Sequence, residues 1–506
     1  MSQDPMVQPD DIHNRTLISN VRPPSWENPQ PARRYNLVVI GAGTAGIVAA
    51  TGAGVLGAKV AIIERSLLGG DCLNTGCVPS KSLIRSAHAA HAANTASRFG
   101  VQALAPAEVD FAAVMERLRK LRAAISRHNS VRHVQASNVD LFFGEARFLG
   151  PERLEVDGQA LRFKKAVIAT GSRPVRPAIP GLEEAGFLTN ETVFSLTERP
   201  ARLAVIGGGP VGCELAQAFQ RLGSQVVLFH DSGHILTRED RDAADIVQQA
   251  FLRENIRLFL NAKVTEVSRQ NGKKFLVYEQ PGGSGEVEVD EILVGVGRLP
   301  NVERLNLEAA GVRYDARGGV EVNNYLQTTN PNIYAAGDVC MAGKFTHAAD
   351  AAARIALQNA LFRGHGKQST LTIPWCTFTD PEVAHVGMYE YEARQEGIEV
   401  TTFKIDLGEI DRAVVDSADA GFVKIHVKKG GDRILGATVV SRNAGEMINE
   451  LTLAMVAKIG MKKLNKVIHP YPVQAEAIRR LTDEYQLTRL TPLPKALLRL
   501  WLRITR

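Results

Sequence analysis

The chain has 506 residues, of which 45% are hydrophobic, and it carries a formal net charge of +6. This length exceeds what one hydrophobic core supports and predicts three or four domains. The modest charge gives no argument for nucleic-acid binding. Five cysteines do not make an extracellular disulfide framework, and no apolar run reaches the roughly 20 residues that span a bilayer. Because the N-terminus lacks the apolar segment of a signal peptide, we expect a cytoplasmic protein.

The first 34 residues are polar and rich in proline, including Pro23-Pro24 and Pro29-Gln30-Pro31. We expect residues 1–34 to form a mostly extended arm that lies across a partner subunit or is disordered. Patterning then predicts βαβ units from Tyr35 and a helical stretch near residues 111–134.

A glycine-rich turn follows the first predicted strand. The apolar run Leu37–Ile40 leads into Gly41-Ala42-Gly43-Thr44-Ala45-Gly46 and a helix of small residues, and the next strand, residues 59–63, ends at Glu64. In a dinucleotide-binding fold, the three glycines allow the tight turn, the approach of a pyrophosphate and the packing of helix on strand. The acid can accept a hydrogen bond from a ribose hydroxyl. The whole pattern predicts a nucleotide site.

The same pattern occurs a second time and predicts a second nucleotide. Leu203–Ile206 precedes Gly207-Gly208-Gly209-Pro210-Val211-Gly212, and a strand follows at residues 225–229. Here His230 stands where an acid would hold a free 2′-hydroxyl. Because an imidazole tolerates a 2′-phosphate better than a carboxylate does, we expect NADPH rather than NADH. Asp231 is next in the chain, and a shift of one residue would reverse this preference.

Cys72 and Cys77 lie five positions apart, just before Pro79. In a regular helix, Cα atoms at this spacing lie roughly 8 to 9 Å apart, whereas a disulfide needs about 4.4 to 6.8 Å. A bridge between them must therefore sit in a distorted turn at the start of a helix, where free N–H groups and the helix dipole favour a thiolate. This predicts a reversible redox disulfide. On the spacing alone, buried free thiols or a structural staple remain alternatives.

Four more segments accompany these motifs: residues 169–174 (ATGSRP), 295–301 (GVGRLPN), 334–339 (YAAGDV) and 379–384 (TDPEVA). From residue 35 to about 485 the chain resembles the class I pyridine nucleotide-disulfide oxidoreductases, the family of dihydrolipoamide dehydrogenase, glutathione reductase and mercuric reductase. The resemblance implies an α/β fold with two Rossmann-like domains, for FAD and NAD(P), and a C-terminal α+β dimerisation domain. It also implies a homodimer in which that domain sends residues into the partner's active site.

The domain boundaries follow from the motifs. We assign residues 1–34 to the N-terminal arm, 35–189 and 311–366 to the FAD-binding domain, 190–310 to the NAD(P)-binding domain, 367–485 to the dimerisation domain and 486–506 to a basic tail. In the dimerisation domain we expect strands near residues 422–427 and 435–440 and a helix near 444–458.

The resemblance assigns roles to cofactor-binding residues. It implies that Asp338 holds the ribityl chain of the flavin and that Ala146 lies near the adenine. The remaining residues that we assign to cofactor binding are Gly70, Thr170, Gly171, Val264, Gly297 and Gly337.

The resemblance also assigns the redox residues. Cys77 would contact the isoalloxazine, while Cys72 would face the substrate. Lys81 and Glu214 resemble the family's ion pair beside the flavin, which would stabilise negative charge on the reduced cofactor. The alternative for Glu214 is an ordinary acid favoured by the dipole at a helix start.

The segment His469–Glu476 bears on the acceptor. Disulfide reductases of this family place a His, with a Glu five residues later, over the substrate-facing thiol as its proton donor and acceptor. If His469 takes that place, its partner is Gln474; if Glu476 is kept, the His position becomes Tyr471. The second register resembles mercuric reductases. A phenol is a poor base at neutral pH, but it can shape a site for a soft metal ion that the cysteine pair ligates.

The chain departs from mercuric reductases in the residues that deliver the metal ion. Those enzymes end in a cysteine pair that passes the ion to the inner site, whereas no cysteine follows Cys376 here, and the N-terminal metal-binding C-x-x-C that many of them carry is absent. The acceptor could therefore be another electrophile, a disulfide or a quinone. We predict no structural metal site. The leading prediction is FAD-dependent transfer of electrons from NAD(P)H through the cysteine pair to a small acceptor, with Hg(II) first. The alternatives are dihydrolipoamide dehydrogenase or other disulfide reductase activity, and a redox-responsive flavoprotein recruited to a membrane or a complex.

The tail from Leu493 to Arg506 predicts an amphipathic helix. One face carries Leu493, Leu497, Leu500 and Ile504, bordered by Trp501, and another face carries Arg499 and Arg503. A basic amphipathic helix can lie on an anionic membrane as a peripheral contact. The alternative is that its apolar face docks on the protein's own surface.

Overall fold

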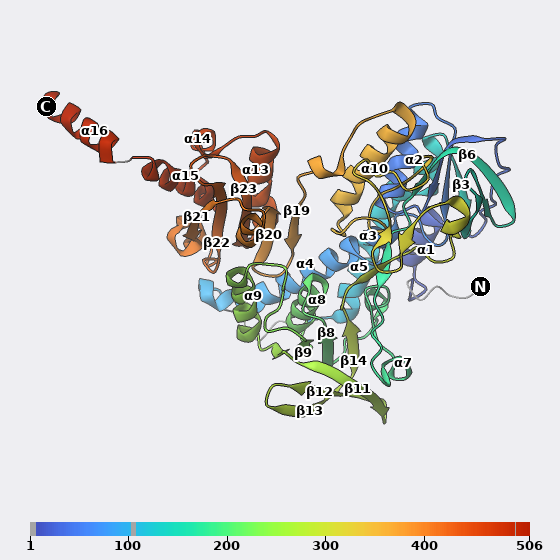
Figure 1. The fold of residues 1–506 in the computed structure, drawn as a ribbon. Coiled ribbons are helices and arrows are strands. Elements are labelled where there is room, and N and C mark those ends of the chain that lie inside the picture. The colour runs from blue at the N-terminus through green and yellow to red at the C-terminus, as the bar shows by residue number, and fades with distance from the viewer. Residues whose placement is uncertain (1–6, 103–107, 491) are drawn as a thin grey trace. The chain divides into compact units, whose positions relative to one another are not determined.

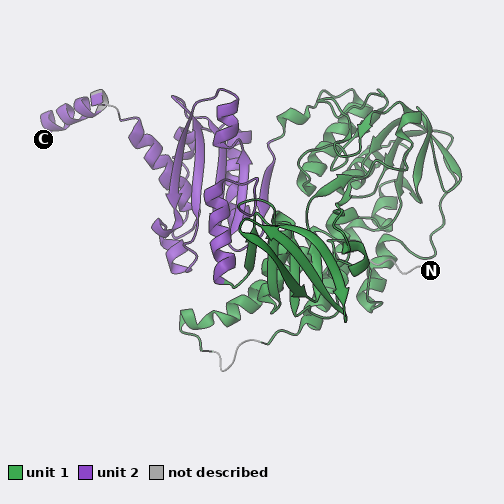
Figure 2. Ribbon diagram, turned by 60° about the horizontal axis from the view of Figure 1, so that its bottom comes forward, with its two compact units in different colours: residues 1–233, 254–371 green, residues 234–253, 372–506 purple. Residues whose placement is uncertain are grey.

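The computed structural model describes residues 7–102, 108–490 and 492–506 of an α/β protein. The chain forms two compact units (Figure 2). Unit 1 comprises residues 1–233 and 254–371, and unit 2 comprises residues 234–253 and 372–506. The predicted fold class is confirmed by the sheets within each unit.

The largest sheet of unit 1 follows the order β3-β2-β1-β6-β5-β4, with β18 also paired to β6 (Figure 1). Its strands are β1 Tyr35–Ile40, β2 Val60–Glu64, β3 Val139–Phe143, β4 Ala146–Gly150, β5 Arg153–Val156, β6 Gln159–Ile168 and β18 Ile333–Ala335. The pairs β1–β2, β2–β3, β1–β6 and β6–β18 are parallel, while β4 and β5 are antiparallel. Parallel strands are covered on both faces, which explains their nearly continuous apolar runs.

A second parallel sheet in unit 1 has the order β10-β9-β8-β14. Its strands are β8 Arg202–Ile206, β9 Gln225–His230, β10 Arg257–Leu260 and β14 Glu291–Val294, and an antiparallel meander adds β11 Lys263–Gln270, β12 Lys273–Gln280 and β13 Gly283–Val289. The short pairs are β7 Ser172–Pro174 with β15 Arg298–Pro300, and β16 Tyr314–Asp315 with β17 Gly319–Val320. Unit 1 therefore contains both predicted nucleotide folds.

The helices of unit 1 include the two that open at the glycine-rich turns. They are α1 Ile12–Val21, α2 Thr44–Val55, α3 Gly70–Asn74, α4 Cys77–Asn94, α5 Phe111–Ser126, α6 Val131–Ala136, α7 Leu182–Ala185, α8 Pro210–Arg221 and α10 Thr346–Phe362. The helix predicted near 111–134 is thus two helices. Ser130 separates them because its hydroxyl caps α6, accepting from the N–H of His133 at 3.3 Å.

Unit 2 is built on an antiparallel sheet of order β19-β20-β23-β22-β21. Its strands are β19 Pro374–Thr377, β20 Glu382–Gly387, β21 Val400–Asp406, β22 Phe422–Lys428 and β23 Ile434–Ser441, and its helices are α9 Arg241–Arg253, α11 Glu390–Gln395, α12 Asp411–Val415, α13 Ala444–Val456, α14 Met461–Leu464, α15 Glu476–Thr488 and α16 Pro492–Ile504. The two predicted strands and the helix near 444–458 are present.

Helix α9 lies inside the range 190–310 that the sequence assigns to the NAD(P) domain, yet it belongs to unit 2. Lys424 Nζ lies 2.8 Å from carboxylate oxygens of both Asp240 and Asp242. Trp375 Nε1 donates to Glu239 Oε1 at 2.8 Å. These polar contacts join the start of α9 to strands β19 and β22. The other domain boundaries remain predictions.

The N-terminal arm contains a helix, so the prediction of a mostly extended arm is wrong for residues 12–21. Asp11 caps α1 by accepting from the N–H of Asn14 at 2.8 Å. Asn14, Leu17 and Val21 share one face and are buried. The prolines that suggested an extended chain lie outside the helix, and its apolar face packs on α5.

A fully buried guanidinium ties this arm to the rest of unit 1. Arg122 Nη2 donates to Asn14 Oδ1 at 2.7 Å, and Arg122 Nη1 donates to the carbonyl of Asn74 at 2.8 Å. Burial lowers the pKa of Arg122 to about 10. Because Asn74 ends α3, helix α1 supports the segment that carries Cys72.

Asn14→Ala is expected to destabilise unit 1, because the buried guanidinium would lose a hydrogen-bond acceptor. The expected loss is about 1–3 kcal/mol of unfolding free energy. Urea unfolding and amide exchange in α1 measure it. Ser19→Ala, on the exposed face of α1, is the matched control; equal stability of the two variants would contradict the anchoring role of Asn14.

Candidate redox site

Two helices separated by a short break hold the cysteines. Helix α3 carries Cys72 and ends at Asn74, while α4 begins at Cys77. Between them Gly76 adopts φ −127° and ψ −112°, outside the helical region. This is the distorted turn that the cysteine spacing predicts. It places Cys77 at a helix N-terminus, where free N–H groups favour an anion.

Both cysteines are free thiols in the structure. A hydrogen bond from Cys72 lowers the pKa of Cys77, and Thr346 and the charge of Lys81 lower it further. Cys77 Sγ lies 3.3 Å from Thr346 Oγ1. The same hydrogen bond and burial raise the pKa of Cys72. These opposite shifts favour a thiolate at Cys77 and a protonated thiol at Cys72.

An ion pair stands one helical turn further along α4. Lys81 Nζ lies 2.7 Å from Glu214 Oε2, and the Glu214 side chain is only 7% exposed. Helices α4 and α8 pack on each other and bring the two residues together. A buried carboxylate needs such a partner, so Glu214 is more than a helix-start acid favoured by the dipole.

A polar network whose pairings the sequence did not predict contacts Asp71 of helix α3. Asp71 Oδ2 lies 2.6 Å from Arg298 Nη2, and Asp71 Oδ1 accepts from Asn190 Nδ2 at 3.0 Å. Arg298 Nε donates to Ser172 Oγ at 2.8 Å. Arg298 and Ser172 lie in sequence motifs quoted above. By contrast, no sequence motif marks Thr346, the residue that contacts Cys77.

The first glycine-rich turn forms a cradle lined by backbone. A Cβ on Gly46 would overlap the carbonyl of Gly41, and one on Gly70 would lie 2.6 Å from the Cα of Gly43. Glu64 accepts from the N–H of Ala42 at 2.7 Å, and burial raises its pKa. Because glycines bring backbone atoms close together here without side chains of their own, the turn fits the pyrophosphate of FAD.

The other residues assigned to cofactor binding lie at several places in unit 1. Asp338 Oδ2 accepts from Ser172 Oγ at 2.6 Å, and Thr170 Oγ1 donates to the carbonyl of Asn301 at 2.7 Å. Ala146 and Val264 are buried in separate apolar cores. Their predicted nucleotide contacts would have to involve backbone atoms. The remaining three, Gly171, Gly297 and Gly337, have positive φ.

The second glycine-rich turn carries the predicted coenzyme selector. His230 ends β9, and its Nδ1 accepts from the N–H of Gly208 at 3.2 Å. The imidazole is 13% exposed, whereas the neighbouring Asp231 carboxylate is 79% exposed. A Cβ on Gly212 would overlap the carbonyl of Gly207. His230, rather than Asp231, therefore faces the turn.

In unit 2 the predicted acceptor residues are not paired with one another. His469 Nε2 lies 3.0 Å from Glu450 Oε2. Tyr471 is exposed and donates to Asp411 Oδ2 at 2.8 Å, which raises its pKa. Glu476 Oε1 accepts from Arg480 Nε at 3.1 Å. Neither predicted pair, His469 with Gln474 or Tyr471 with Glu476, is hydrogen-bonded among the described residues.

This segment also holds buried polar atoms without a hydrogen bond among the described residues. They are His469 Nδ1, Gln474 Nε2, Gln474 Oε1 and Glu476 Oε2. Buried polar groups in native proteins are nearly always paired. Their concentration in residues 469–476 marks a segment whose polar groups are incompletely satisfied within one chain.

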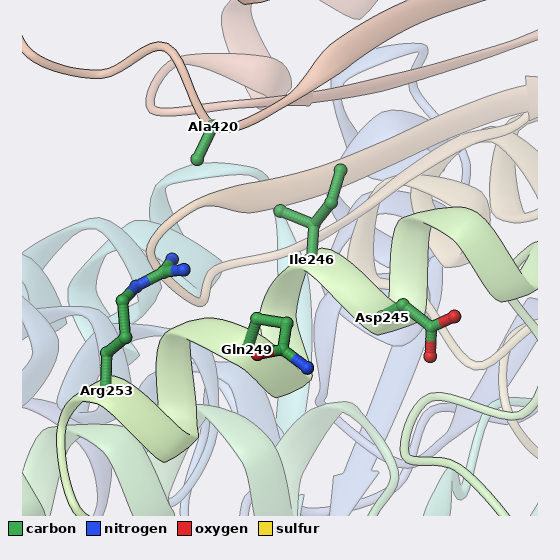
Figure 3. Close-up of a pocket in the computed structure, with 5 residues that line it drawn as sticks. All are labelled: Asp245, Ile246, Gln249, Arg253 and Ala420. Atoms are coloured by element: carbon green, nitrogen blue, oxygen red, sulfur yellow. The ribbon is translucent and has the colours of Figure 1, made fainter.

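A separate shallow hollow in unit 2 is shown in Figure 3. Its lining consists of Asp245, Ile246, Gln249 and Arg253 from α9 and of Ala420. None of these five side chains is a thiol or an imidazole.

Paired nucleotide folds around a dithiol are the architecture of an oxidoreductase that links a nicotinamide coenzyme to thiol chemistry. The chain belongs to the pyridine nucleotide-disulphide oxidoreductase family: residues 35–354 match that family, and residues 373–482 match its dimerisation domain. The family is FAD-dependent, which agrees with the glycine cradle of unit 1.

The chain is similar to proteins that carry different names. The chain is 35% identical over 460 residues to mercuric reductase of Staphylococcus aureus, covering 90% of this chain and 84% of that one. It is 35% identical over 463 residues to dihydrolipoyl dehydrogenase of Thermus scotoductus, with 89% and 97% covered. RclA, an HOCl-induced flavoprotein disulfide reductase from Escherichia coli, matches with TM-score 0.79 and 30% identity, over 89% and 99% of the two chains. The Cu(II) complex of RclA matches with TM-score 0.79, 29% identity and the same coverage.

The holoenzyme of Cys72→Ser is expected to show a long-wavelength charge-transfer band without reductant, because the Cys77 thiolate would lie against oxidised flavin. A lowered pKa keeps the thiolate at pH values below the ordinary thiol pKa of about 8.5, and acidification removes it. Adding Thr346→Val should raise the titration midpoint by about one pH unit, equivalent to about 1.4 kcal/mol.

Absorbance against pH measures the midpoint, and Thr346→Ser, which keeps the hydroxyl, is the matched control. Cys77→Ser should have no band. A midpoint at or above that of a free thiol in Cys72→Ser would show that Cys77 is not the stabilised thiolate.

Proposed function

We propose that this protein passes electrons from NADPH, through FAD and the Cys72–Cys77 pair, to a thiophilic small acceptor, with Hg(II) or another soft electrophile as the substrate class. The observation that carries the proposal is the dithiol at the α3–α4 break, with Cys77 stabilised as a thiolate. Thiolates are the ligands that soft metal ions prefer. When bound, FAD accepts the reducing equivalents of the nicotinamide and relays them to the thiol side.

The residues divide the work around the acceptor. Ligation of Hg(II) by Cys72 and Cys77 releases the proton that Cys72 carries, and two electrons derived from NADPH then convert Hg(II) to Hg(0). Lys81 keeps a positive charge near Cys77 and is itself held by Glu214 at 2.7 Å. Thr346 positions the Cys77 sulfur through its hydroxyl.

The chemistry of Tyr471 supports a metal ion over a dithiol substrate. A dithiol requires a base to take its proton. The Tyr471 phenol donates a hydrogen bond to Asp411, which raises its pKa. Tyr471 is therefore a poor base at neutral pH. Mercuric reductases among the relatives and the Cu(II) complex of RclA support the same acceptor class.

We further propose a homodimer in which segment 469–476 of one chain completes the site of its partner. The match of residues 373–482 to a dimerisation domain supports this proposal.

The second candidate is dihydrolipoamide dehydrogenase activity. It is favoured by one contact, the pair between His469 and Glu450 at 3.0 Å, because a carboxylate can orient a histidine as a base. The similarity to dihydrolipoyl dehydrogenase points the same way.

Thiol-buffered Hg(II) is expected to stimulate NADPH oxidation. Dihydrolipoamide oxidation should be slower than in disulfide reductases that have the His–Glu pair over the substrate-facing thiol. The expected difference is roughly 10²–10⁴-fold, the contribution of a positioned base. Steady-state assays of both acceptors on one preparation measure the two rates. Tyr471→Phe should impair the Hg(II) reaction, because the phenol hydroxyl would be lost from the acceptor site.

His469→Ala is the matched control and should leave the Hg(II) reaction unchanged. Brisk dihydrolipoamide oxidation that is lost in His469→Ala and unaffected in Tyr471→Phe would make His469 the base and establish the second candidate. No turnover of either acceptor would favour the redox-responsive binding role instead.

NADPH is expected to give a higher kcat/KM than NADH, because His230 faces the glycine-rich turn where an acid would repel a 2′-phosphate. His230→Glu should reverse the order, and Asp231→Asn should leave it unchanged. Initial rates with each coenzyme test this. A wild-type preference for NADH of tenfold or more, about 1.4 kcal/mol, would show that Asp231 binds the ribose.

A further inference from the structure

The last helix, α16, presents an apolar surface that the described chain leaves uncovered. Leu497, Leu500, Trp501 and Ile504 are 55–71% exposed. The alternative, docking of this face on the protein's own surface, is therefore not seen for these four residues. The side chain of Leu493 lies outside the described part. The helix also lies beyond residue 482, where the match to the dimerisation domain ends.

The side chains of α16 are sorted by chemistry around the helix axis. At 100° per residue, the apolar side chains fill one continuous arc of roughly 200°, and the cations fill an opposite arc of roughly 80°. The apolar arc holds Leu497, Leu498, Leu500, Trp501, Leu502 and Ile504, and the basic arc holds Lys495, Arg499 and Arg503. Two kinds of surface therefore lie back to back on one helix.

The charge of this segment is entirely positive. Residues 491–506 contain Lys495, Arg499, Arg503 and Arg506 and no acidic residue, so most of the chain's net charge of +6 resides there. All four cations are exposed. A partner surface that covers the apolar arc and also attracts these cations must have an apolar interior beneath a negatively charged outer layer.

An anionic lipid surface has both properties, and the dimensions of α16 suit it. The helix has 13 residues, about 20 Å at 1.5 Å per residue, which is too short to cross a bilayer. No helix in the described ranges has the length and hydropathy of a membrane span. A basic helix with Leu and Trp opposite its charges lies in the plane of the interface.

A second copy of the tail fits the arc less well. A helix pair buries a stripe of about 100°, which would leave half of the 200° arc in water. It would also bring two uniformly positive helices together, whereas an anionic surface attracts them.

We propose that α16 docks in-plane on an anionic lipid surface, with Trp501 and the leucines in the headgroup boundary and Lys495, Arg499 and Arg503 directed to lipid phosphates. This inference is independent of the electron acceptor.

Sedimentation of the FAD-loaded full-length protein with vesicles tests the proposal. The protein should bind vesicles that contain phosphatidylglycerol and not vesicles of phosphatidylcholine alone. The double variant Arg499→Ser/Arg503→Ser should partition roughly 30-fold more weakly, since two surface cations are removed. Lys462→Ser/Lys463→Ser, which removes two exposed cations from α14, is the matched control and should bind as the wild type does.

Trp501 provides an independent readout. The fluorescence of the protein should shift to shorter wavelength on binding anionic vesicles, and Trp501→Phe should abolish the shift, because the chain's two other tryptophans lie at 26 and 375. Equal binding to both vesicle types, or an unchanged affinity in the Arg499/Arg503 variant, would overturn the proposal. So would self-association in the absence of lipid that Leu500→Glu abolishes, since the tail would then bind a second copy.

Discussion

The break between α3 and α4 is the constraint on which the site depends. It brings two cysteines five positions apart into hydrogen-bond contact and leaves Cys77 at a helix N-terminus. One sulfur then gains stabilisation as a thiolate while the other remains protonated. An unbroken helix would separate the two sulfurs and remove the free N–H groups beside Cys77.

The surrounding polar groups keep that break in place from several directions. Asp71 is held by Arg298, which also reaches the Ser172–Asp338 pair. On the other side, the buried Arg122 joins Asn74 to the N-terminal helix. The motifs of the flavin site and the N-terminal arm therefore act on one short segment of backbone.

The two units divide the chemistry of the protein. Unit 1 contains both glycine-rich turns, the dithiol and the Lys81–Glu214 pair, so the residues to which the proposal assigns electron transfer belong to one compact body. Unit 2 contains the segment 469–476, whose polar groups are only partly satisfied, and the exposed helix α16. Both features therefore lie in unit 2.

The sequence by itself determined the family, the two nucleotide folds and the cysteine pair. Glycines at fixed spacing, and two cysteines whose spacing does not suit a bridge within a regular helix, are local constraints on the backbone. It also led to Lys81 and Glu214 through the family resemblance. Only the tertiary structure decided the contacts between distant segments: Thr346 at Cys77, Arg122 between Asn14 and Asn74, and Glu450 rather than Gln474 at His469. Such pairings depend on how helices and loops pack, and no local periodicity encodes them. The helix in the proline-rich arm was missed for the same reason, since its stability comes from burial against α5.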